Sequence, residues 1–265
     1  DLIPERRGDF IMAFYTILFS PCGRTRRIAE ILEREWKEEQ RICIDLCDPQ
    51  VTKSLPYFKE DDTCIIAMPS YGGRAPQTAL QRLRVIQGNH ASAILVCSYG
   101  NRAYEDTLLE MKECAQESGF VCRAAIAAVA EHSILHQYGA GRPDAQDTQE
   151  LNVFARQIRE HLEKDAACEL QVTGNHPYKP YNGVPLKPSA NQSCMQCGQC
   201  AAQCPVQAIP IKHPEKTDTD RCISCMRCIA VCPVHARSLN KLLLAVSVRK
   251  LHKACVTRKI GRAHV

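Results

Sequence analysis

The sequence predicts an α/β protein in which a five-stranded, doubly wound parallel sheet is followed by a small, cysteine-rich α+β domain. Two observations carry this prediction. In the first 165 residues, short apolar runs alternate with helical stretches, which is typical of a parallel sheet covered on both faces. Further along the chain, one pattern of four cysteines and a proline occurs twice, beginning at Cys194 and at Cys222.

The five predicted strands are continuous apolar runs. They cover residues 14–20, 42–46, 64–70, 93–100 and 124–130. We expect helices at residues 25–40, 76–87, 104–118 and 144–164. In the first of these helices, Ile28, Leu32 and Trp36 recur on one face. Five such strands in about 150 residues suit a doubly wound sheet of flavodoxin type, where ligands bind at the carboxyl ends of the strands.

An internal duplication marks the second domain. Residues 194–209 (CMQCGQCAAQCPVQAI) and 222–237 (CISCMRCIAVCPVHAR) agree at eight of sixteen positions, including every cysteine and the proline after the fourth. In a Cys-x2-Cys-x2-Cys-x3-Cys-Pro run, three thiolates on a tight loop face one cubane and the fourth can reach a second one. A structural zinc site instead uses two CxxC knuckles set further apart and shares no ligand. The pattern therefore indicates iron–sulfur clusters.

In these motifs the chain resembles the bacterial two-cluster ferredoxins. The resemblance implies two 4Fe-4S clusters that exchange their fourth ligands. One cluster would be held by Cys194, Cys197, Cys200 and Cys232. The other would be held by Cys222, Cys225, Cys228 and Cys204. Met226 replaces the Gly198 of the first repeat, and we expect it to form an apolar cover over the second cluster.

Four stretches that follow predicted strands point to a ligand site, and one of them, AEHSI (130–134), follows the fifth strand. The other three provide the candidate ligand residues. FSPCGRT (19–25) precedes the first helix, where backbone N–H groups and the positive helix end could hold a phosphate or merely cap the helix. PSYGGRAP (69–76) and SYGNRAY (98–104) each supply an aromatic residue and glycines for close backbone approach. The candidate residues are Ser20, Cys22, Gly23, Arg24, Thr25, Tyr71, Gly72, Gly73, Tyr99, Gly100, Asn101 and Tyr104.

Taken with the cysteine repeats, these loops resemble flavodoxin–ferredoxin fusion proteins of anaerobic bacteria, over most of the chain. The resemblance implies an FMN with its phosphate on the Ser20–Thr25 loop, extra charge from Arg24, and a ring stacked by Tyr71 and Tyr99. That family usually has threonine at the position of Cys22, and a thiol is a weaker donor than a hydroxyl.

The function that this resemblance implies is electron transfer between the FMN and the two clusters. Two alternatives stay open: a ferredoxin whose sheet domain is a flavin-free docking module, and a flavin-dependent reductase of a small substrate. No obvious pocket acids or bases stand out, so we expect an electron carrier or oxidoreductase component, with no catalytic residues of its own, rather than a stand-alone hydrolase. His132 either faces the flavin or is a satisfied histidine at a strand end.

A phosphatase function is disfavoured by one residue. Low-molecular-weight tyrosine phosphatases carry a nucleophilic cysteine in the same loop, followed six residues later by an arginine. After Cys22 that position is Ile28, and Arg26 and Arg27 fall short of it.

We expect the chain to divide into five parts. These are a flavodoxin-like domain (12–165), a proline-rich linker (166–188), a two-cluster ferredoxin domain (189–238), a basic helix (239–258), and terminal residues foreign to the native protein (1–11 and 259–265). The tail KIGRAHV matches a translated sequencing adapter, and ERRGDF can be encoded by the purine-rich codons of a ribosome-binding site. We expect the basic helix to pack on the cluster domain, with docking to an acidic redox partner as the alternative.

Charge and hydropathy limit the partners. The formal charge of +5 falls to roughly +1 once two clusters of about −2 each are counted, so no nucleic-acid partner follows. No apolar run is long enough to span a membrane, and no signal peptide is visible at the start. We therefore expect a cytoplasmic protein whose partners are redox proteins.

Overall fold

The computed structural model describes residues 13–36, 40–164 and 169–265. Residues 1–11 and Met12, which entered the predicted division of the chain, lie outside the described residues. Five parallel strands form the main sheet: β1 (Ala13–Leu18), β2 (Gln40–Asp45), β3 (Thr63–Pro69), β4 (Ser92–Tyr99) and β5 (Val121–Val129). Their order, β2-β1-β3-β4-β5, is that of a flavodoxin-like sheet and confirms the predicted fold class.

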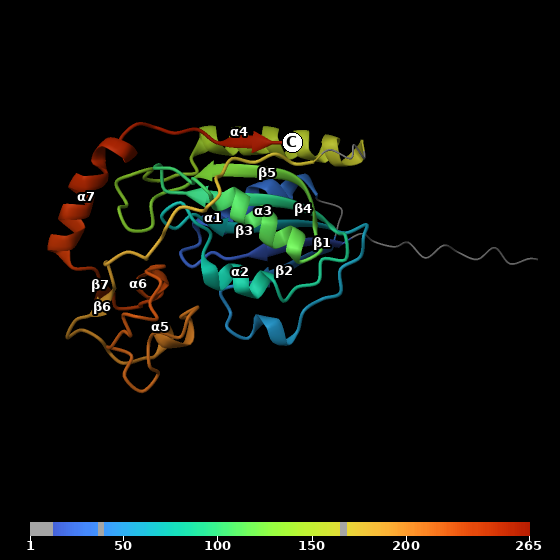
Figure 1. The fold of residues 1–265 in the computed structure, drawn as a ribbon. Helices are drawn as coiled ribbons and strands as arrows, with labels where there is room; N and C mark the ends of the chain where they lie inside the picture. Colours follow the sequence, from blue (N-terminus) through green and yellow to red (C-terminus); the bar gives the residue numbers. More distant parts are fainter. Residues whose placement is uncertain (1–12, 37–39, 165–168) are drawn as a thin grey trace, which may run out of the picture.

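Helices cover both faces of this sheet, as Figure 1 shows. One face carries α1 (Arg24–Leu32) and α4 (Ala145–Glu163), and the other carries α2 (Gln77–Leu83) and α3 (Thr107–Glu117). Since successive side chains of a strand point to opposite faces, β1, β3, β4 and β5 contribute to both cores, whereas the edge strand β2 contributes only to the core under α2 and α3. The main sheet therefore lies between two helical layers, and the ends of its strands are not covered by these helices.

The first predicted helix is shorter than expected. It ends at Leu32, and a 3-10 turn, η1 (Glu33–Glu35), follows. Trp36 nevertheless packs as the sequence pattern predicted, because its ring stacks on Phe14 with the centroids 4.8 Å apart. A second 3-10 turn, η2 (Val51–Lys53), lies between β2 and β3.

The cysteine-rich part repeats its backbone as well as its sequence. Short helices α5 (Gln199–Ala202) and α6 (Arg227–Ala230) follow equivalent cysteine loops, and β6 (Ser189–Ala190) pairs with β7 (Arg237–Ser238) to close the unit. Positive φ angles recur at matching positions: 54° at Gln196 and 55° at Ser224, 74° at Gly198 and 63° at Met226, 52° at Gln207 and 50° at His235. The two halves thus share one loop geometry, and Met226 holds a conformation that favours glycine.

The predicted C-terminal helix is α7 (Lys241–Cys255), and it packs differently from the prediction. Asn240 caps it by accepting hydrogen bonds from the backbone N–H groups of Leu242 and Leu243. Its apolar stripe of Leu244, Val248, Leu251 and Cys255 lies against Ile134, Leu135 and Tyr138 of the sheet domain rather than against the cluster domain. The expectation of packing on the cluster domain was wrong, because the apolar side chains of the loop after β5 bury this stripe. Within the described residues no helix is long and apolar enough to cross a membrane.

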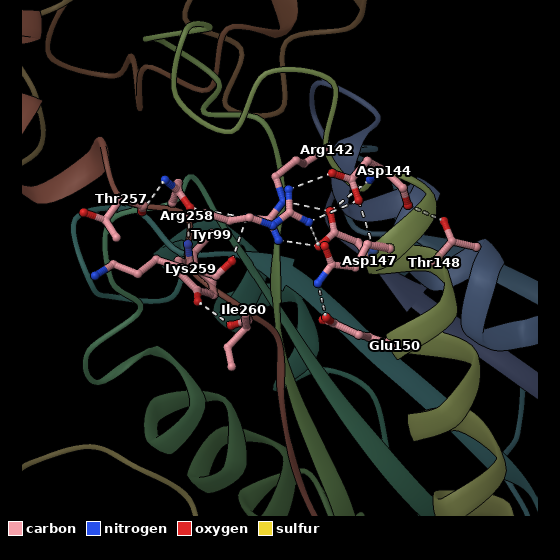
Figure 2. Close-up of polar contacts among 12 residues, drawn as sticks. Tyr99, Arg142, Asp144, Asp147, Thr148, Glu150, Thr257, Arg258, Lys259 and Ile260 are labelled. Atoms are coloured by element: carbon pink, nitrogen blue, oxygen red, sulfur yellow. Dashed lines mark hydrogen bonds and ion pairs between the residues drawn. The ribbon is translucent and has the colours of Figure 1, made fainter.

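The sheet gains a sixth strand that the sequence did not predict. β8 (Arg262–His264) pairs antiparallel with β5, opposite Ala125–Ala127. This strand lies in the segment expected to be foreign to the native protein, so no strand had been sought there. Figure 2 shows how the chain just before it is anchored: the Tyr99 hydroxyl donates to the carbonyl of Ile260, and Arg142 donates to the carbonyl of Lys259.

Arg142 is the centre of this polar cluster. Its guanidinium makes a bidentate ion pair with Asp147 in which both side chains are almost fully buried, at 4% and 6% exposure. Arg258 approaches the same group from the surface and pairs mainly with Asp144, the N-cap residue of α4. The cluster therefore joins the start of α4 to the segment that follows α7 (Figure 2).

We expect Arg142→Ala to lower the free energy of unfolding by about 3 kcal/mol, because removing one partner of a buried ion pair strands the other. The matched control is Arg258→Ala, which removes a solvent-exposed arginine from the same cluster and should cost far less. Urea unfolding of the three proteins measures both effects. Equal losses for the two variants would contradict the buried-pair account.

Candidate functional site

A cavity of about 480 Å³ opens at the carboxyl ends of β1, β3, β4 and β5. Most of its walls come from the loops that follow these strands, and the FSPCGRT loop forms one side. Its lining residues are Ser20, Pro21, Cys22, Arg24, Thr25, Pro69, Ser70, Tyr71, Ser98, Tyr99, Gly100, Ala130, Glu131, His132, Ser133 and Cys225. The cavity lies where a doubly wound sheet places its ligand site. We call it the loop cavity.

The Ser20–Thr25 loop wraps the start of α1. Gly23 has a φ of 78°, which lets the chain turn sharply into the helix. The Ser20 hydroxyl accepts a hydrogen bond from the backbone N–H of Arg26 at 3.0 Å, and the buried Thr25 hydroxyl lies 2.7 Å from that of Ser98. The first N–H groups of a helix have no partner within the helix and carry its positive dipole end, so this loop can bind an anion.

Arg24 is already engaged in an ion pair. Its guanidinium donates to Glu131 and lies 3.1 Å from Nδ1 of His136. Burial alone would raise the pKa of Glu131, but hydrogen bonds from Arg24, the Gly141 amide and His136 outweigh it and lower the pKa to about 2. The predicted phosphate-binding arginine is therefore neutralised by a carboxylate on the opposite wall of the loop cavity.

Cys22 points to the cluster domain. Its Sγ donates to the carbonyl oxygen of Cys225 at 3.0 Å, and burial raises the pKa of this thiol. The residue that departs from the expected phosphate loop thus bonds to a cysteine loop more than two hundred residues away. Arg227 donates to the carbonyl of Pro21 at 3.4 Å and reinforces the same contact.

A larger cavity, of about 1060 Å³, shares Ser70, Tyr71, Gly100, His132 and Ser133 with the loop cavity. We call it the ring cavity. Its other walls come from three further parts of the chain: the linker (Lys179, Tyr181, Val184, Pro185 and Leu186), the cysteine loop (Ile223 and Ser224) and α7 (Ser247 and Leu251). The two cavities are therefore neighbours, and residues of both the sheet domain and the cysteine loop line them.

The predicted ring-side residues fall into two groups. Tyr71 and Gly72 line the ring cavity; burial raises the pKa of Tyr71, and the nearby thiols of Cys225 and Cys22 raise it further. The Tyr99 ring is instead packed on Tyr104, with centroids 5.2 Å apart, and its hydroxyl bonds to Ile260 at 3.2 Å. The Asn101 amide donates to the carbonyls of Cys255 and Thr257. Of the remaining candidates, Gly100 lines both cavities and Gly73 contacts Glu105.

His132 lies at the junction of the two cavities. Its Nδ1 accepts hydrogen bonds from the backbone N–H groups of Ile134 and Leu135, both at 3.2 Å, so a neutral ring carries its proton on Nε2. Burial, aided by the positive charges of His136, Arg102 and Arg24, lowers the pKa of His132 to about 4. His132 packs tightly on Gly100, where an added Cβ would lie 2.8 Å from the histidine.

Four of the predicted cluster ligands line one cavity. A small cavity is bounded by Cys204 together with Cys222, Cys225 and Cys228. This set takes its fourth cysteine from the other repeat, as the ferredoxin resemblance implies. Burial raises the pKa of Cys225 and of Cys228, the latter to about 12, so as free thiols both are protonated at neutral pH.

The remaining four predicted cluster ligands are more exposed to solvent. Cys197 is exposed, Cys194 and Cys232 are partly exposed, and Cys200 is buried. Burial would raise the pKa of Cys232, but backbone N–H groups, that of Ala236 at 3.2 Å among them, outweigh it and lower the pKa. The Ala208 N–H donates to Cys204 in the equivalent position of the first repeat, at 3.3 Å. Within the described ranges no three His, Cys, Asp or Glu side chains lie close enough to hold a single metal ion.

Comparisons with known proteins match two different parts of the chain. A family model of a 4Fe-4S dicluster domain matches residues 193–236. No curated protein matches the chain. Among solved structures, the Streptococcus pneumoniae TIGR4 flavodoxin is 18% identical with a TM-score of 0.40, covering 56% of this chain and 99% of its own. A Fusobacterium nucleatum flavodoxin bound to flavin mononucleotide is 14% identical with a TM-score of 0.39, covering 56% and 98%.

A third similar structure is the NAD(P)H:quinone oxidoreductase of Methanothermobacter marburgensis. It is 14% identical with a TM-score of 0.34, covering 60% of this chain and 99% of its own. The strand order of the main sheet, β2-β1-β3-β4-β5, carries the fold assignment. The chain thus has a flavodoxin-like sheet domain followed by a ferredoxin-like 4Fe-4S domain, an arrangement that suggests electron transfer.

Sequence reasoning missed several residues of these cavities. Glu131 and Ser98 sit beside predicted residues, at or just after strand ends, and the strand-end rule could have included them. Tyr181 and Ile223 gave no comparable signal, because a linker and a cysteine loop are not expected to line a sheet-domain site.

The first prediction for this site concerns His132. A histidine with its pKa lowered to about 4 is neutral in the folded protein, whereas the unfolded chain takes up a proton near pH 6.5. Stability should therefore fall as pH drops from about 6.5 to about 4, and His132→Asn, which can still accept from the backbone, should show less of this loss. The measurement is the free energy of unfolding of both proteins between pH 6.5 and pH 4. The same dependence on pH in both proteins would contradict a lowered pKa for His132.

The second prediction concerns ligand exchange between the repeats. Cys204→Ala should damage the cluster on Cys222, Cys225 and Cys228 and spare the other, because Cys204 shares their cavity. Cys232→Ala, the matched control from the second repeat, should do the reverse. Paramagnetic NMR of the two variants, prepared without oxygen, distinguishes the clusters. Loss of the cluster adjacent in sequence to each mutation would show that the ligands are not exchanged.

Proposed function

We propose that this protein is an electron-transfer iron–sulfur flavoprotein that carries FMN in the sheet domain and two 4Fe-4S clusters in the cysteine domain. The observation that supports it best is the ring cavity, because its walls include both strand-end loops and Ile223–Ser224 of the Cys222–Cys225 loop. A ligand in this cavity would touch the protein segment that carries two proposed cluster ligands.

The described residues fit both cofactors, the 4Fe-4S clusters and FMN. Four cysteines around one cavity supply the thiolates of a cubane, and backbone N–H groups directed at sulfur favour the charged thiolate. For FMN, the loop cavity offers hydroxyls and a helix N-terminus for a phosphate, and the ring cavity offers apolar walls of suitable size. Bound FMN would supply two-electron chemistry and each cluster one-electron chemistry.

Each part of the chain has a role in this proposal. The Ser20 and Thr25 hydroxyls and the amides near Gly23 hold the phosphate; Tyr71, Gly72 and Gly100 border the ring. All eight cysteines of the two repeats are proposed as cluster ligands, divided between the clusters as the ferredoxin resemblance implies. We keep the boundaries 12–165, 166–188, 189–238 and 239–258 as proposed domain limits. The unidentified partners are redox proteins.

One observation favours the second candidate, in which the sheet domain is a docking module without flavin. Arg24 is paired with Glu131, and Cys22 is bonded to Cys225. The Arg24 and Cys22 side chains of the predicted phosphate loop are therefore both engaged in contacts within the protein. Under this candidate the loop serves the interface between the domains, and the protein binds clusters only.

Cofactor content separates the two candidates. Protein prepared without oxygen should contain about eight iron, about eight acid-labile sulfide and about one FMN per chain. Iron and sulfide without FMN, and no FMN uptake on titration, would overturn the proposed function in favour of the docking module. Stoichiometric zinc without sulfide would contradict both candidates.

The phosphate end can be tested by one substitution. Thr25→Val should weaken FMN binding by roughly 10- to 150-fold, since a hydrogen bond to a charged acceptor contributes about 1.5–3 kcal/mol. The matched control is Thr16→Val, which alters another buried threonine, whose hydroxyl donates to Glu33 outside both cavities. Calorimetric titration measures both. Unchanged affinity in Thr25→Val would place the phosphate elsewhere.

A further inference from the structure

The proline-rich linker is tied to both domains where it passes the ring cavity. On the sheet-domain side, Arg74 donates to the carbonyl of Lys179 at 2.8 Å, and the Lys179 backbone N–H donates to Asp106 at 2.6 Å. On the cluster side, the Lys187 ammonium donates to the carbonyl of Cys222, and the Ser224 hydroxyl donates to that of Val184 at 3.4 Å. Residues 179–187 therefore form a fixed strap rather than a free spacer.

Tyr181 in this strap lies directly against the Gly72 loop. An added Cβ on Gly72 would come within 2.5 Å of Cδ2 and Cε2 of the tyrosine ring. Gly72 also has a φ of 64°, so two independent constraints favour glycine at this position. Tyr181 is partly buried and lines the ring cavity beside Tyr71.

The strap supplies an aromatic side chain to the ring cavity, which the loop after β4 does not. Tyr99 lines only the loop cavity, and its ring and hydroxyl are engaged by Tyr104 and Ile260. Tyr71 and Tyr181 are the tyrosines that line the ring cavity among the described residues. A planar aromatic ligand there gains contact with an aromatic face from the strap.

We propose that the linker builds the ring end of the flavin site, with Tyr181 as the residue that packs on the isoalloxazine ring. The Val184–Leu186 segment and Ile223 close the same end against the cysteine loop. This inference rests on the proposed function and adds to it a binding residue from outside the sheet domain. It follows that flavin binding requires the strap, and that the sheet domain alone offers an incomplete site.

Contacts at the ring end do not depend on the phosphate, whereas contacts on the Ser20–Thr25 loop do. Riboflavin, which has the ring and lacks the phosphate, therefore reports on the strap alone. FMN reports on both ends.

The test is titration of the full chain with FMN and with riboflavin, followed by calorimetry and by flavin fluorescence. Tyr181→Ala should weaken both ligands by about 5- to 150-fold, as loss of an aromatic stacking partner does, and should leave more of the fluorescence of bound flavin. Tyr181→Phe should stay within about 2-fold of the parent. Thr25→Val should weaken FMN and leave riboflavin unchanged.

The matched control is Tyr57→Ala, which removes an exposed tyrosine that lines neither cavity and should bind like the parent. Iron content and circular dichroism of each variant report folding. If the parent binds both flavins and Tyr181→Ala binds them equally well with equal quenching, the strap inference is overturned while the proposed function stands. If the parent binds neither flavin, the proposed function fails and the inference fails with it.

Discussion

The arrangement of this molecule depends on how the Cys222–Cys228 loop packs on the strand-end loops of the sheet domain. Ile223 packs against the main core of the sheet domain, and Cys22 donates to the carbonyl of Cys225. Burying an apolar side chain contributes about 1.5–3 kcal/mol, and a buried hydrogen bond about 1. These contacts fix one cysteine loop beside the open ends of the strands. The ring cavity exists because the two surfaces meet there.

The same contact explains the uneven exposure of the two cysteine sets. The set around Cys225 faces the sheet domain and is mostly buried, whereas Cys194 and Cys197 face outward. A cluster on the inward-facing cysteines would be placed to exchange electrons with the sheet domain. A cluster on the outward-facing cysteines would be placed to exchange electrons with a redox partner. At the phosphate end, the Arg24–Glu131 pair and neutral His132 leave little free positive charge. Binding of an anion there would rely on the helix N-terminus and hydroxyls.

Local patterns in the sequence predicted the fold well, and long-range contacts account for what they missed. Each predicted strand is present because continuous apolar runs report burial directly. The cysteine-rich segment matches the family model because its ligand spacing is itself a local pattern. The partner of Cys22 lies 203 residues away and that of Arg24 lies 107 residues away, and no periodicity encodes such contacts. Tyr99 was expected to stack a ring, but a carbonyl 161 residues later binds its hydroxyl. Tyr181 lies in a segment without periodicity, so only the fold could bring it to Gly72.

In the proposed function, one chain holds a two-electron group beside two one-electron groups. The most direct test is an anaerobic reductive titration of the purified protein, followed by absorbance of the flavin and of the clusters. The account predicts uptake of about four electrons per chain, two for the flavin and one for each cluster. Uptake of about two electrons, with no flavin absorbance to bleach, would contradict it.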